Sequence, residues 1–105
     1  MIHVIATIEL ADGKRDEFLT EFHKLVPLVL AEEGCLDYGP TVDVDCTLPN
    51  ADPRDNVVTV VERWAGLDEL EAHLVAPHML EYRKVVKEWV RGSQLQILEP
   101  AAAPA

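Results

Sequence analysis

The chain has 105 residues, of which 19 are acidic and nine are basic, so its formal net charge is −10. Nearly half of the residues are apolar, which is typical of a globular domain and not of a disordered or fibrous chain. The acidic balance argues against a nucleic-acid partner, which needs a basic patch, and no apolar run approaches the roughly 20 residues that membrane insertion needs.

The first half of the chain predicts a strand, a helix and a second strand. Apolar residues alternate over residues 2–10, as in a half-buried strand, and then recur at helical spacing over residues 18–33. Gly34 can take the left-handed conformation that ends such a helix. Residues 35–45 are predicted to form an edge strand, because Pro40 cannot donate a hydrogen bond to a central ladder.

A loop rich in turn-forming residues follows, and the second half of the chain then begins with a central strand. Residues 56–64 carry valines on both faces of the pleat, as expected of a strand that is covered on both sides. Apolar residues at helical spacing predict a helix over residues 67–74, and Pro77 starts a second helical segment that Gly92 ends. Residues 94–99 alternate again and predict the last strand.

This order of strands and helices predicts an α+β fold of the ferredoxin-like kind, a split βαβ sandwich. We expect residues 1–99 to form the domain and residues 100–105 to be a flexible C-terminal tail. The helices can cover only one face of the sheet, so the other face, which carries Ile5 and part of residues 57–61, needs a cover. A second copy of the chain is the simplest cover, and we predict a homodimer with a closed β core, a dimeric α/β barrel.

The start of the chain and its cysteines predict a cytoplasmic protein. The first residues lack the charged and apolar regions of a signal peptide. Cys35 and Cys46 form neither a CxxC pair nor a zinc-like spacing, which suits a reducing compartment. No glycine-rich phosphate-binding motif occurs, so a nucleotide cofactor has no support in the sequence.

Several short motifs along the chain resemble those of one family. They are Val26-Pro27, Glu32-Glu33-Gly34-Cys35 followed by Tyr38, Glu62-Arg63-Trp64, Leu70-Glu71-Ala72-His73-Leu74 and Pro77-His78-Met79. Together they resemble the antibiotic biosynthesis monooxygenase (ABM) superfamily, closest to its bacterial quinol monooxygenase branch, from the first strand to the last. The resemblance implies a dimeric ferredoxin-like enzyme that oxidises a quinol or polyphenol with molecular oxygen, without haem, flavin or metal.

The same superfamily includes haem-degrading enzymes, and the chain departs from their pattern. That pattern needs an asparagine on the first strand, a tryptophan on the second helix and a haem-ligating histidine further along. The matching positions here hold Thr7, His73 and Arg83. These departures disfavour haem degradation.

His73 and His78 are the predicted catalytic residues. Removing a proton from a quinol raises its electron density, so the reaction needs a base, and the unperturbed pKa of histidine is about 6.5. The two histidines flank the break at Pro77, and Tyr82, one turn after His78, could hydrogen-bond a substrate oxygen. The structural alternative makes His73 a hydrogen-bonded core residue, His78 a helix cap and Tyr82 part of the core.

Other residues are weaker candidates for substrate contact. Trp64 is predicted to shape the pocket wall, with the more common role of a tryptophan as a packing residue as the alternative, and Tyr38 and His3 could also touch the substrate. Glu62 lies in a valine-rich strand and needs a partner, because burying an unpaired charge is costly. A metal site built from this glutamate and the two histidines would have precedent in oxygenases, but the spacing is not diagnostic, and we predict no metal.

The sequence therefore predicts a cofactor-independent monooxygenase that acts on a quinol or a related aromatic substrate with dioxygen. An isomerase or another enzyme acting on a small oxygenated metabolite stays open as an alternative, because a fold does not fix a reaction. A non-enzymatic stress protein that binds quinones is the other alternative.

Overall fold

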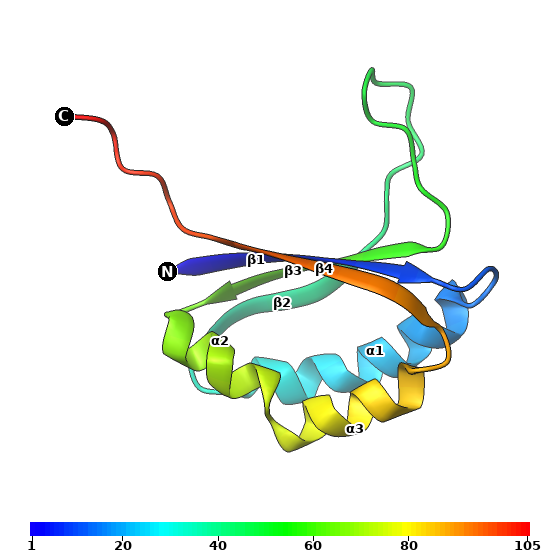
Figure 1. Ribbon diagram of the computed structural model, residues 1–105, viewed down its shortest axis with the longest axis horizontal. Helices are drawn as coiled ribbons and strands as arrows, with labels where there is room; N and C mark the ends of the chain where they lie inside the picture. Colours follow the sequence, from blue (N-terminus) through cyan, green and yellow to red (C-terminus); the bar gives the residue numbers. More distant parts are fainter.

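A computed structural model describes all 105 residues and contains a four-stranded antiparallel sheet with three helices on one of its faces (Figure 1). The elements in chain order are β1 (Ile2–Leu10), α1 (Arg15–Leu30), β2 (Cys35–Thr41), β3 (Val57–Trp64), α2 (Leu67–Leu74), α3 (Pro77–Val86) and β4 (Val90–Leu98). The strand order is β2-β3-β1-β4, which confirms the ferredoxin-like α+β fold. None of the helices combines the length and the apolar character that crossing a membrane requires.

The core lies between the sheet and the helices and follows the two periodicities of the sequence. Alternate residues of β3 face the helices, so that Val58, Val60 and Trp64 are buried. The buried stripe of α1 meets them with residues three or four apart, which are Phe18, Phe22, Leu25 and Val29. Burial of these large side chains on one face of the sheet fixes the strand register, because a slip of one residue would turn them toward water.

The edge position predicted for the second strand is confirmed, but its predicted end is wrong. β2 is an edge strand that ends at Thr41 and not at residue 45. Thr41 pairs with Thr59, and β3 begins only two residues before that partner, at Val57. In this register only residues 42 and 43 would still face β3, and residues 42–56 contain neither helix nor strand.

The last helix and the last strand also differ from the prediction. α3 ends at Val86 instead of near Gly92, and β4 begins at Val90, four residues earlier than expected. Gly92 lies inside the strand opposite Glu9, next to a register shift between Glu9 and Leu10. A bulge of this kind breaks the period-two pattern, which explains why the first part of β4 was not visible in the sequence.

The face of the sheet opposite the helices has no cover within the chain. On this face Ile5 of β1 lies between Val61 of β3 and Gln96 of β4, and Val61 is 39% exposed. Figure 1 shows residues 42–56 (green-cyan) and the C-terminal residues (red) extending away from the sheet on this uncovered side. The positions of the apolar residues agree with the prediction of an open face.

Candidate functional site

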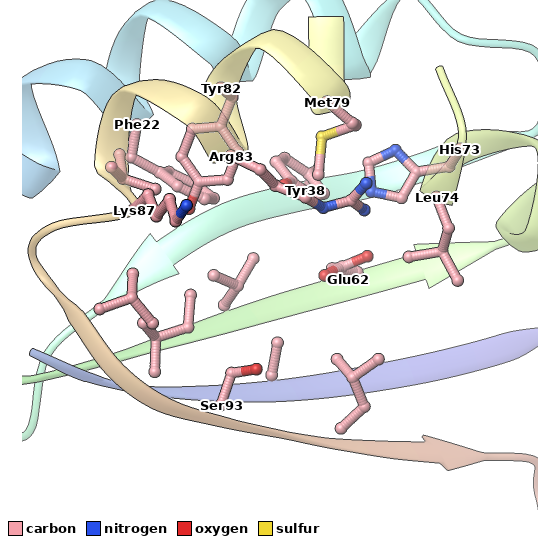
Figure 2. Close-up of a pocket in the computed structure, with 16 residues that line it drawn as sticks. Phe22, Tyr38, Glu62, His73, Leu74, Met79, Tyr82, Arg83, Lys87 and Ser93 are labelled. Carbon is pink, nitrogen blue, oxygen red and sulfur yellow. The ribbon is translucent and has the colours of Figure 1, made fainter. Parts of the chain in front are cut away.

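A cavity of about 420 Å³ lies between the sheet and the second helical region (Figure 2). Its walls are mainly apolar and aromatic, which is typical of a site for a small organic ligand. β1, β2, β3 and β4 form its floor, and α1, α2 and α3 supply the rest of the wall. It is lined by Ala6, Ile8, Phe22, Tyr38, Val60, Glu62, His73, Leu74, Met79, Tyr82, Arg83, Val86, Lys87, Val90, Ser93 and Leu95.

His73 is the histidine that lines this cavity. It lies in the last turn of α2, is 1% exposed, and packs against Trp64 with ring centroids 4.6 Å apart. Its Nδ1 atom lies 2.9 Å from Oε2 of Glu32, whereas its Nε2 atom has no protein partner. Every fully enclosed side-chain nitrogen or oxygen has a partner. We deduce that Nε2 is open to the cavity.

The burial of His73 sets its protonation state. Loss of solvent lowers the pKa of His73 below its ordinary value, although the carboxylate of Glu32 opposes that shift. The positive charge of Arg83 lowers it further. The imidazole is therefore neutral at pH 7, with a lone pair that can accept a proton at a ring nitrogen.

Glu62 is the second titratable group in the cavity and comes from β3. Its Oε1 atom accepts a hydrogen bond of 2.9 Å from Nε1 of Trp64, and its side chain points from the sheet toward α3 (Figure 2). Burial raises the pKa of Glu62 to about 7, with a further contribution from the negative charge of Glu32. A carboxyl group that titrates near neutral pH can give or take a proton under working conditions.

Two tyrosines contribute hydroxyl groups to the same space. Tyr38 of β2 is the cross-strand partner of Glu62, and Tyr82 of α3 packs edge-on against Phe22. Burial raises the pKa of both tyrosines well above the ordinary value, so both hydroxyls stay protonated. Neither hydroxyl makes a hydrogen bond within the chain, so each is free to donate one to a ligand.

Positive charge enters the cavity from α3. Arg83 lies in α3 and Lys87 directly follows the last residue of this helix. In Figure 2 the side chain of Arg83 runs beneath α3 toward His73. Neither side chain is within ion-pair distance of a carboxylate, in a chain with 19 acidic residues. They give the cavity a cationic side next to His73.

The predicted site residues are only partly brought together. His73, Tyr82 and Tyr38 line the cavity. Trp64 lies under His73 and binds Glu62, so it supports the cavity without forming its wall. The other two predicted site residues, His78 and His3, do not line the cavity.

His78 and His3 are outside the cavity for different reasons. His78 begins α3 and turns toward Glu32, with 2.7 Å between its Nε2 atom and Oε2 of the carboxylate. His3 pairs with Arg63 and Leu98 on the uncovered face of the sheet, because it is one residue out of phase with the buried Val4. No group of three or more His, Cys, Asp and Glu side chains has an arrangement that could hold a metal ion. The metal site considered above would combine His73 and His78 with Glu62, but both histidines contact Glu32 instead.

Sequence reasoning missed Glu32, Arg83 and Lys87 as parts of the site. The partner of Glu62 could have been found, because Trp64 is two residues further along the strand and therefore on the same face. No local signal could have found the contact between Glu32 and His73, which are 41 residues apart in the chain.

Comparisons with known proteins indicate one family and show solved structures with a similar fold. The family model for antibiotic biosynthesis monooxygenase matches residues 1–85. The Escherichia coli K12 protein named probable quinol monooxygenase YgiN is 38% identical over 102 residues, covering 95% of this chain and 98% of that protein. The crystal structure of PA3566 from Pseudomonas aeruginosa is similar, with a TM-score of 0.80, 25% identity and coverage of 96% of this chain and 94% of that one. A conserved protein from Methanosarcina mazei has a TM-score of 0.78, 26% identity and coverage of 95% and 92%.

Proposed function

The chain belongs to the antibiotic biosynthesis monooxygenase family, and on this basis we propose that it is a quinol monooxygenase that works without a cofactor. The substrate would be a quinol or a related polyphenol, and the co-substrate dioxygen. In the proposed reaction a quinol becomes a hydroxyquinone, one oxygen atom of dioxygen forms a new carbon–oxygen bond, and the other leaves as water. The substrate loses two hydrogen atoms and supplies all four electrons that dioxygen takes.

One observation carries the proposal: polar groups without a protein partner line a mainly apolar cavity. They are Nε2 of His73, the second carboxyl oxygen of Glu62, and the hydroxyls of Tyr38 and Tyr82. A flat aromatic diol has an apolar ring and hydroxyls at its rim, so it matches an apolar space with polar groups at its boundary. The likeness to a relative named as a quinol monooxygenase supports the same substrate class.

Each of these residues has a role in the proposed mechanism. Nε2 of His73 takes the proton of a ring hydroxyl, which makes the ring electron-rich enough to reduce dioxygen. The guanidinium of Arg83 stabilises the resulting quinolate, because it lies on the cavity wall and no carboxylate of the chain pairs with it. Tyr82 and Tyr38 orient the substrate by hydrogen bonds, and Glu62 exchanges a proton with the oxygen-derived groups.

The proposal predicts that the purified protein, treated with a chelator, consumes oxygen when it is given a reduced naphthoquinol. The rate, measured with an oxygen electrode, should exceed autoxidation several-fold and saturate with substrate. An anaerobic sample should show no product, because dioxygen is the oxidant. Product formed without oxygen would instead support an isomerase, and saturable binding with no turnover would support a quinone-binding protein.

We also propose that two copies associate through their uncovered faces to form the dimeric α/β barrel, in the cytoplasm. Ile5 and Val61 lie next to each other on this face, and residues 42–56 extend from the same side with apolar side chains that are exposed. These exposed side chains are Val42, Val44 and Leu48. A sheet face of this kind is stabilised when a second sheet packs on it. The thiols of Cys35 and Cys46 are unpaired, which suits a reducing compartment.

Sedimentation velocity tests the dimer. The unmodified chain should sediment as a dimer at micromolar concentration, and Val61→Glu should sediment as a monomer, because the substitution places two carboxylates in an apolar interface. Leu28→Glu is the matched control, since Leu28 is 53% exposed on α1, and it should leave the dimer intact. A monomeric unmodified chain, or a dimeric Val61→Glu variant, would contradict this arrangement.

A further inference from the structure

The turn that follows α1, the helix α2 and the start of α3 meet at one carboxylate oxygen. Oε2 of Glu32 lies 2.9 Å from Nδ1 of His73 and 2.7 Å from Nε2 of His78. The side chain of His73 is 2% exposed, that of Glu32 is 14% exposed and that of His78 is 24% exposed. The three groups therefore form a chain from the cavity to the surface, with Glu32 in the middle.

The chemistry of this contact fixes which nitrogens carry protons. A carboxylate oxygen can only accept, so both histidines must donate to it. His73 then has its proton on Nδ1, and its Nε2 atom, which faces the cavity, is a free acceptor. The opposite tautomer would put a lone pair against the carboxylate and a proton in the cavity, where the histidine could not act as a base.

We infer that Glu32 and His78 are positioning residues: Glu32 holds His73 in the tautomer that makes it a base, and His78 holds Glu32 in place. His78 does not touch the substrate, because it contributes nothing to the cavity lining and its Nε2 atom is occupied by Glu32. The inference rests on the proposed function, since it assigns roles in that reaction. It also replaces the prediction that both histidines transfer protons to or from the substrate.

The tautomer can be read by NMR without any turnover. Protonated and bare ring nitrogens of histidine differ widely in ¹⁵N chemical shift, so a ¹⁵N-histidine sample at neutral pH should show His73 with a protonated Nδ1 and a bare Nε2. Glu32→Gln should shift His73 toward the opposite tautomer or a mixture. Glu33→Gln, at the exposed neighbouring residue, should leave the spectrum unchanged. A protonated Nε2 in the unmodified protein would overturn the inference.

Kinetics of quinol oxidation test the roles. Glu32→Gln should lower kcat at least about tenfold with little change in KM, since in the serine-protease triad the wrong histidine tautomer lowers kcat about 10⁴-fold. Glu32→Asp, which keeps the charge, should recover part of the loss. His78→Ala should also lower kcat, and His78→Gln should restore it, because the glutamine amide can still donate to Glu32.

The glutamine variant separates positioning from proton transfer, because glutamine cannot act as a base. If His78→Gln were as impaired as His78→Ala, His78 would be a proton-transfer residue and the inference would be wrong. If Glu32→Gln kept full kcat, the role of Glu32 would also be wrong. If the unmodified protein showed no oxygen-dependent turnover, the proposed function would fail, whereas the tautomer would still be decided by the spectra.

Discussion

His73→Ala is expected to lower the enzyme-dependent oxidation of a naphthoquinol by at least about 100-fold, which is the lower end of what a general base contributes. The substitution removes the ring nitrogen that is open to the cavity and whose ring Glu32 holds in place. The measurement is the initial rate of oxygen uptake after subtraction of autoxidation.

His73 also packs on Trp64, so a second variant is needed to separate catalysis from folding. His73→Asn can keep a hydrogen bond to Glu32 while it removes Nε2, and it should be as inactive as the alanine variant. His23→Ala is the matched control, because His23 is an exposed histidine on α1, and it should retain the full rate. If either His73 variant folds and keeps the rate of the unmodified enzyme, His73 is not the base.

Glu62→Gln is expected to raise the free energy of unfolding more at alkaline pH than at acidic pH. The expected difference between the two effects is on the order of 3 kcal/mol. Burial raises the pKa of Glu62 from its ordinary 4.5 to about 7 in the folded state. Below about pH 4.5 the residue is protonated in both the folded and the unfolded chain, so its burial as a charged group does not reduce the stability of the folded state. As the pH rises toward about 7 only the unfolded chain releases its proton, and the folded state loses stability relative to the unfolded one.

Urea unfolding gives the free energy of unfolding of the variant and of the unmodified protein at about pH 5 and at about pH 8. The effect is the change between these two pH values in the difference between the two proteins. The difference isolates Glu62, because the opposite contribution of His73, whose pKa is lowered, is present in both proteins. Glu9→Gln is the control for the replacement itself, since Glu9 is an exposed glutamate on β1. A difference for Glu62→Gln that is independent of pH would show that the pKa of Glu62 is not raised.

The parts of the fold that could be predicted are those with a local periodicity. Alternation placed β1, valines on both faces of the pleat placed β3, helical spacing placed α1 and α2, and Pro40 placed β2 at the edge. Each of these patterns follows from the side-chain geometry of one element. The ends of β2 and β4 could not be predicted, since they depend on where the partner strand ends and on a bulge opposite Gly92. Strand pairing is a property of two segments, and one segment does not reveal it.

The same distinction explains the candidate site. His73 and Tyr82 could be proposed because their positions on helices follow from spacing. Whether His3 reaches the cavity depends instead on which face of β1 packs against the helices. Glu32 could not be found, because it reaches His73 only after α1 has packed against the sheet and α2 has followed β3. The raised pKa of Glu62 likewise depends on the burial that the whole fold provides.

The most direct test of the proposed function is oxidation of a quinol under ¹⁸O₂, with the product analysed by mass spectrometry immediately after quenching. A sample of unlabelled product in labelled water corrects for exchange of quinone oxygens. A monooxygenase that uses the substrate as its reductant should place one ¹⁸O atom in each product molecule, and His73→Asn should abolish this label above the spontaneous reaction. Product without label, formed at the enzyme-dependent rate, would contradict the account.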